Sequence, residues 1–239
     1  MKNYEKNYWA KRADHYNKTS WVKNEDLMNA FLRMIPEQTF NSILEVGVGT
    51  GAVAEKVAEN IGSLIGIDIS KEMISNINHP NITAMVGDAH KLKFDNNAFD
   101  LIYMRNVMHY IDNPDLVLSE IYRCLKPGGH FLFAQVIPPD DSISEEYDWL
   151  IGRNLHYPTK SEIINLLNDF HIEDINYYIL KSQSIMNWLN NTCNDEKEKN
   201  IIFDRHHESS KKYKTLVNYS ASNGDILVDI KHFMLLAVK

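Results

Sequence analysis

The chain contains few cysteines and no long apolar segment. Only two of its 239 residues are cysteines, Cys124 and Cys193, and their spacing matches neither a disulfide framework nor a zinc site, so no bound metal is expected. No apolar run approaches membrane-spanning length, and the N-terminus lacks the apolar core of a signal peptide. These absences predict a cytoplasmic protein without a membrane partner.

Positive charge is also scarce. The chain has 25 Lys and Arg residues against 32 Asp and Glu residues, which gives a formal net charge of -7. Without a basic stripe to neutralise phosphates, no nucleic-acid partner is expected. The short basic run at residues 211–214 is interpreted as a solvated helix face. The length is sufficient for one α/β domain with a substantial core.

The most informative segment is residues 43–51, which reads Ile-Leu-Glu-Val-Gly-Val-Gly-Thr-Gly. An apolar run ending in three glycines predicts a strand and a tight loop whose backbone approaches a small molecule. Residues 52–61 have apolar side chains at helical spacing, so the amides of a helix start would face that molecule. The looser dinucleotide pattern Gly-x-Gly-x-x-Ala is also present, which leaves a nicotinamide cofactor as an alternative.

Alternation of apolar strands with amphipathic helices organises the first two thirds of the chain. Strands are expected near residues 42–47, 64–68, 82–86, 99–104 and 129–136, with helices near 25–34, 51–61, 70–77 and 114–125. This order predicts a parallel sheet with helices on both faces. Ligands of such sheets bind at the carboxyl ends of the strands, where Gly47, Asp68, Asp88 and Arg105 all fall.

Several motifs in this order together resemble the class I methyltransferases, which bind S-adenosylmethionine (SAM). They are the glycine loop, the strand that ends at Asp68, the Gly-Asp-Ala run at 87–89, the strand at 99–104 and the Lys-Pro-Gly-Gly turn at 126–129. The resemblance covers about residues 40–137, and it is closest to the ubiquinone/menaquinone-type branch that methylates small molecules. It implies a Rossmann-like, seven-stranded, mostly parallel sheet whose last strand is antiparallel. The implied cofactor is SAM, and the implied product is S-adenosylhomocysteine.

The resemblance also implies roles for individual residues. Gly47 and Gly49 would line the methionine end of SAM, Asp68 would hold the ribose, and Asp88 with Ala89 would hold the adenine. Glu45, which a dinucleotide fold would usually replace with an aliphatic residue, would orient the loop or contact the methionine amine through water. The full set of cofactor-binding candidates is Tyr8, Tyr16, Glu45, Gly47, Gly49, Gly51, Asp68, Ile69, Asp88, Ala89 and Arg105.

The flanking segments are predicted to cover the site. Tyr8 and Tyr16 belong to an N-terminal aromatic cluster that forms either a lid or ordinary packing on the sheet. About 45 residues separate the apolar segment at 172–180 from the final strand at 226–238, which is too long for a structureless loop and predicts helices. The expected single domain, 1–239, therefore comprises N-terminal lid helices (1–40), a cofactor-binding core (41–137) and a candidate substrate cap (138–160 and 182–224).

Methyl transfer requires mainly correct positioning, and a base is needed only if the acceptor carries a proton. His109 follows the fourth strand and is the candidate base and acceptor contact, with packing at a helix start as the alternative. Trp149, His156 and Tyr157 are candidate acceptor-binding residues, although a purely structural role is the favoured alternative for each.

These features predict SAM-dependent methylation of a small-molecule acceptor, with oxygen favoured and nitrogen and carbon as alternatives. A non-catalytic SAM-binding protein and a nicotinamide oxidoreductase are the hypotheses from other classes. Neither the acceptor nor the oligomeric state can be read from the sequence.

Overall fold

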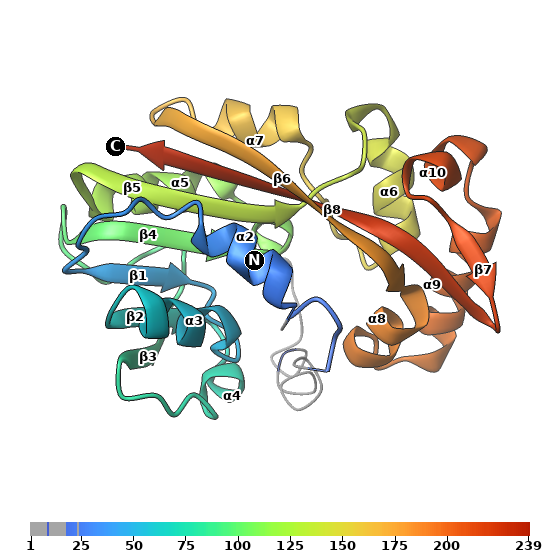
Figure 1. Ribbon diagram of the computed structural model, residues 1–239, viewed down its shortest axis with the longest axis horizontal. Coiled ribbons are helices and arrows are strands. Elements are labelled where there is room, and N and C mark those ends of the chain that lie inside the picture. Colours follow the sequence, from blue (N-terminus) through green and yellow to red (C-terminus); the bar gives the residue numbers. More distant parts are fainter. Residues whose placement is uncertain (1–8, 10–17, 23) are drawn as a thin grey trace.

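A computed structural model describes Trp9 and residues 18–22 and 24–239. Its centre is an eight-stranded sheet in the order β3-β2-β1-β4-β5-β8-β6, with β7 paired to β8 (Figure 1). The strands are β1 (Ile43–Val46), β2 (Leu64–Asp68), β3 (Ile82–Val86), β4 (Phe99–Arg105), β5 (Leu125–Val136), β6 (His171–Ser184), β7 (Ser220–Ser222) and β8 (Asp225–Val238). Tyr8 and Tyr16 lie outside the described residues.

The pairing confirms the predicted Rossmann-like sheet. Strand β1 is central and pairs in parallel with β2 and β4, and β4 pairs in parallel with β5. The last strand, β8, runs antiparallel between β5 and β6. The three-residue β7 is an addition to the expected seven strands. Strand β5 also begins earlier than expected, because Leu125 pairs with Phe99 before the Lys-Pro-Gly-Gly turn.

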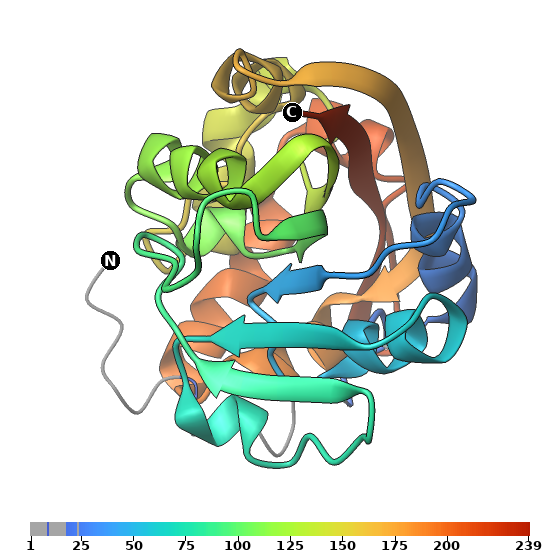
Figure 2. The same ribbon diagram turned by 90° about the vertical axis from the view of Figure 1, so that its left-hand side faces the viewer.

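Helices cover both faces of the sheet. Helices α2 (Glu25–Leu32) and α3 (Ala52–Asn60) pack with β1 and β4 in one apolar core, and α5 (Pro114–Cys124) and α7 (Lys160–Leu166) pack in a second core on the opposite face. Figure 2 shows this division, with green α5 to the left of the sheet and blue α2 to the right. Helix α4 is limited to Lys71–Ile74 and is shorter than the predicted 70–77.

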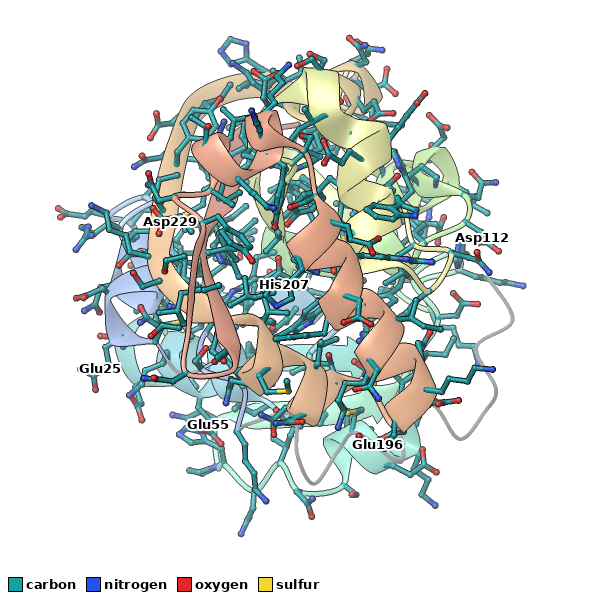
Figure 3. The ribbon with its side chains drawn as sticks, turned by 90° about the vertical axis from the view of Figure 1, so that its right-hand side faces the viewer. Glu25, Glu55, Asp112, Glu196, His207 and Asp229 are labelled. Carbon is teal, nitrogen blue, oxygen red and sulfur yellow. The ribbon has the colours of Figure 1, made fainter. Side chains whose placement is uncertain are left out.

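A third apolar core lies beyond the end of β5, around the extended halves of β6 and β8. It is formed by α6 (Ser144–Ile151), α8 (Ile185–Thr192), α9 (Glu196–Glu208) and α10 (Lys211–Leu216), which lie together in Figure 1. Figure 3 looks onto this end, where α9 carries the labelled Glu196 and His207. The segment between β6 and β8 is therefore largely helical, as its length predicted, and also contains β7.

The long pair β6 and β8 joins this third core to the sheet. Its ladder runs from His171 opposite Val238 to Ser184 opposite Leu227, with register shifts between Ile172 and Asp174 and between Leu180 and Gln183. None of the described helices is long and apolar enough to cross a membrane.

The different exposure of two neighbouring residues of α9 leads to a stability prediction for the third core. Ile202 is 1% exposed, whereas its neighbour Ile201 is 44% exposed. Ile202→Ala should lower the free energy of unfolding by about 2–4 kcal/mol because it leaves a cavity, while Ile201→Ala should change it by less than about 0.5 kcal/mol. Urea unfolding followed by circular dichroism measures both. Equal effects of the two variants would show that α9 does not pack as described.

Candidate functional site

A cavity of about 460 Å³ opens at the carboxyl ends of the parallel strands, where the sequence predicted a ligand. Its walls come from the loops that follow β1, β2, β3 and β4 and from the N-terminal segment. The lining residues are Trp9, Trp21, Val22, Tyr110 and Ile111 together with residues 45–50, 52–53, 67–73, 87–90 and 105–107. All the candidate cofactor residues in the described part of the chain are among them except Gly51, which is the N-cap of α3.

The glycine loop brings the backbone against this cavity. Gly47 has φ +79°, and a Cβ atom at this position would lie 2.3 Å from Val107 Cγ2. Gly51 has φ +86° where it begins α3. The amides of Gly47 and Val48 donate hydrogen bonds of 2.8 and 2.9 Å to the Ile67 carbonyl, which fastens the loop to β2. A side chain at Gly47 would therefore displace the wall of the cavity.

Asp68 joins the glycine loop to the turn after β2. Its Oδ2 accepts a 2.9 Å hydrogen bond from the Gly49 amide, and its Oδ1 accepts a 2.9 Å bond from the Ser70 amide. Burial raises the pKa of the Asp68 carboxyl, and these backbone hydrogen bonds oppose the rise. Each carboxylate oxygen can accept a second hydrogen bond, so Asp68 can organise the loop and still bind ligand hydroxyl groups.

Glu45 is a buried acid that lines the cavity, with only 2% of its surface exposed. The Tyr103 hydroxyl donates a 2.9 Å hydrogen bond to Glu45 Oε2, because the two residues face each other across β1 and β4. Burial raises the pKa of Glu45 to about 8, while Tyr103 and the nearby Arg105 act to lower it. A strongly shifted carboxyl in a cavity is typical of a functional group.

Arg105 lies at the end of β4, two residues beyond Tyr103, and also lines the cavity. Its Nη2 donates a 3.3 Å hydrogen bond to the Trp21 carbonyl, which ties the N-terminal segment to the strand. One end of the cavity thus carries an acidic side chain, Glu45, and a basic side chain, Arg105. The sequence did not identify Tyr103 or Trp21 as part of it, because neither the strand register nor the path of residues 18–22 can be read from local patterns.

The other end of the cavity is formed after β2 and β3. Asp88 Oδ1 accepts hydrogen bonds from both the backbone amide and the ring Nδ1 of His90, at 2.9 and 2.8 Å. Partial burial acts to raise the pKa of the Asp88 carboxyl, but these bonds outweigh it and hold that pKa below its ordinary value. Ile69, which is 38% exposed, and Ala89 give this end an apolar surface. The arrangement suits a flat ring with a polar edge.

His109 does not line the cavity. It is buried in the short turn η1 (Met108–Tyr110), where its Nδ1 lies 2.9 Å from Gln135 Nε2 and its ring stacks on Tyr157 at 4.4 Å. Its neighbour Tyr110 lines the cavity instead, with its ring 4.7 Å from that of Trp9. Because the Gln135 amide donates to Nδ1, the remaining proton of a neutral ring lies on Nε2. The role of His109 as a base stays a prediction.

The candidate acceptor residues also lie away from the cavity wall. Trp149 is 44% exposed on α6, beneath the Arg205 guanidinium. His156 lies between the carboxylates of Asp148 and Glu162. Burial acts to lower the pKa of His156, but these two carboxylates outweigh it and raise that pKa above its usual value. Tyr157 is buried against His109. Their roles in acceptor binding remain predictions.

Residues 44–133 match the model of the methyltransferase domain family. This match identifies a methyltransferase domain in the chain, which is similar to the class I SAM-dependent methyltransferases. A ubiquinone/menaquinone biosynthesis C-methyltransferase from Rickettsia prowazekii is 26% identical over 233 residues, covering 73% of this chain and 93% of that protein. This relative confirms the resemblance of the chain to the quinone-type branch.

Two solved structures share the fold of this chain. The YcgJ protein from Bacillus subtilis superposes with a TM-score of 0.77 at 17% identity, covering 90% of this chain and 99% of that one. Phosphoethanolamine N-methyltransferase 2 from Haemonchus contortus, in complex with phosphomonomethylethanolamine and S-adenosylhomocysteine, gives a TM-score of 0.67 at 19% identity, covering 98% of this chain and 58% of that one. At these identities the likeness establishes the fold.

The close contact at Gly47 leads to a binding prediction. Gly47→Ala should weaken S-adenosylhomocysteine binding by roughly 100-fold, because the new Cβ would push Val107 and the loop into the cavity. Gly128→Ala is the matched control, since Gly128 has a similar φ of +75° but nothing within 4 Å of the added Cβ. Isothermal titration calorimetry should find its affinity within about twofold of the wild type. Wild-type affinity in Gly47→Ala would contradict this account of the loop.

Proposed function

We propose that this methyltransferase binds SAM along the cavity and transfers its methyl group to a small-molecule acceptor. The observation that carries the proposal is the order of charged groups along one cavity. Glu45 and Arg105 lie at one end, Asp68 beside the glycine loop lies between, and Asp88 lies at the other end. SAM presents an amino acid, a ribose and an adenine in that order, and each group meets a matching side chain.

The amino-acid end is the most specific part of this match. A methionine group carries an ammonium and a carboxylate, and Glu45 and Arg105 offer the opposite charge to each. Tyr103 holds the Glu45 carboxyl in place through its hydroxyl. A dinucleotide would bring a pyrophosphate to the glycine loop, and this anion offers Glu45 no cationic partner. The charge pattern therefore supports SAM over a nicotinamide cofactor.

The remaining lone pairs of Asp68 suit the two ribose hydroxyls, and the apolar Ile69 and Ala89 suit the faces of the adenine ring. When bound, SAM supplies an electrophilic methyl group on a positively charged sulfur. The protein has to hold the acceptor in line with that group and exclude water from it. The aromatic rings of Trp9, Trp21 and Tyr110, which line the cavity, can form an apolar surface for the acceptor.

We favour oxygen as the methylated atom, with His109 available to accept a proton if the acceptor loses one. In the described structure His109 Nδ1 accepts a hydrogen bond from Gln135 and Nε2 carries the ring proton, so this role requires a rearrangement of η1 that frees Nδ1. Relatives named as C-methyl and N-methyl enzymes make carbon and nitrogen acceptors the alternatives.

The reaction is tested by an acceptor screen. The purified protein is incubated with SAM carrying a deuterated methyl group and with panels of phenols, amines and activated-carbon compounds, and products are sought by mass. At least one panel should gain a single labelled methyl group. Asp68→Ala is the negative control and should bind SAM at least about 100-fold more weakly, because it loses both the ribose contacts and the anchor of Gly49. Unchanged SAM affinity in this variant would contradict the proposed site.

The pKa of Glu45 leads to a proton-release prediction. With a pKa of about 8, Glu45 is mostly protonated in the free protein at pH 7 and must ionise to pair with the ligand ammonium. Binding of S-adenosylhomocysteine should therefore release roughly 0.9 proton at pH 7, and affinity should rise roughly 50-fold between pH 6 and pH 8. Calorimetry in buffers of different ionisation enthalpy measures the release.

Glu45→Gln is the matched control for proton release, because an amide of the same shape cannot titrate. It should release no proton through this group, and its affinity should stay near the low-pH value of the wild type at every pH. A release in Glu45→Gln equal to that of the wild type would assign the proton to another group.

A further inference from the structure

His90 lies between two carboxylates that belong to different loops. Its Nδ1 is 2.8 Å from Asp88 Oδ1, in the turn after β3, and its Nε2 is 3.0 Å from Asp112 Oδ1, in the segment between η1 and α5. The side chain of His90 is only 15% exposed, whereas that of Asp88 is 51% exposed. Asp112 is labelled in Figure 3, on the side of the molecule away from Glu25. His90 is thus held between two carboxylates, and its side chain is less exposed than that of Asp88.

Both hydrogen bonds from His90 end on the same oxygen of Asp88. Oδ1 accepts one bond from the backbone amide and one from the ring, which fixes the orientation of the carboxyl group and leaves Oδ2 for a ligand in the cavity. A carboxylate that receives these bonds stays ionised, and an ionised carboxylate can only accept. Oδ2 therefore requires a donor from the ligand.

The second contact of His90 fixes the opposite wall of this end of the cavity. Ile111, next to Asp112, lines the cavity together with Asp88, Ala89 and His90. The distance of 3.0 Å between His90 Nε2 and Asp112 Oδ1 is that of an ion pair, although the atoms are not aligned for a hydrogen bond. His90 consequently sets the position of Asp88 relative to the wall formed by Ile111.

We propose that His90 is a positioning residue that makes this end of the cavity select a 6-amino purine over a 6-oxo purine. This inference rests on the proposed function, since it takes the purine of SAM to lie at Asp88. The amino group of adenine donates to Asp88 Oδ2, whereas the oxo group of hypoxanthine would place an acceptor against an acceptor. His90 acts through Asp88, because it occupies Oδ1 and prevents the carboxyl group from rotating away from the unfavourable contact.

The test compares two ligands on the same variants by calorimetry. The ligands are S-adenosylhomocysteine and S-inosylhomocysteine, which differ at position 6 of the purine. The wild type should prefer the 6-amino ligand by roughly 100-fold, because a site built for a donor leaves its acceptor unpaired with the wrong ligand. His90→Ala should reduce this preference to roughly tenfold or less.

Two conservative variants separate positioning from a purely structural role. The Nδ2 atom of an asparagine replaces the ring Nδ1, so His90→Asn keeps the donor to Asp88 and should keep the wild-type preference. The Nε2 atom of a glutamine replaces the ring Nε2, so His90→Gln keeps a donor to Asp112 and should lose the preference as His90→Ala does. If His90→Ala proves unfolded in a thermal melt, the comparison of His90→Asn with His90→Gln decides the test.

The outcomes distinguish this inference from the function on which it rests. If His90→Ala and His90→Gln lower the affinity for both ligands by the same factor, the residue is structural and the inference is wrong. If the wild type binds both ligands equally well, the inference is also wrong, although SAM binding and methyl transfer stand. If the wild type binds neither ligand and transfers no methyl group, the proposed function itself is wrong.

Discussion

The site depends above all on one carboxylate, that of Asp68, which bonds to the backbone of two loops at once. The Gly49 amide belongs to the loop after β1, and the Ser70 amide belongs to the turn after β2. Parallel pairing of β1 and β2 brings both loops to the same edge of the sheet, but pairing alone does not fix their conformation. The Asp68 carboxylate fixes the conformation of both loops with two charge-assisted hydrogen bonds. The positions of the groups that flank Asp68 depend on this link.

The fold and the central part of the site could be predicted because their signals are local. A strand, three glycines and a helix start within 20 residues specify the loop, and Asp68 and Asp88 each follow an apolar run directly. The partner of Glu45 could not be predicted in this way. Tyr103 lies 58 residues further along the chain and meets Glu45 only through the register of β1 and β4. The register between two strands that are far apart in the chain, such as β1 and β4, cannot be read from the local periodicity of either strand.

The turn after β4 shows a different limit of sequence reasoning. His109 and Tyr110 are adjacent, and the chemistry of imidazole made His109 the natural candidate for the cavity. The turn instead directs Tyr110 to the cavity and buries His109 against Gln135 and Tyr157. Neighbours in a short turn point in different directions, so a candidate chosen by chemistry alone can be one residue away from the group that meets the ligand.

The shared strands β6 and β8 have a mechanical consequence. Because both run without a break in the chain from the sheet into the third core, that core cannot swing as an independent lid on a flexible linker. At the register shift between Leu180 and Gln183, the Ser182 amide still bonds to Asp229 of β8. The third core is thus joined to the sheet by two paired strands rather than by a loop.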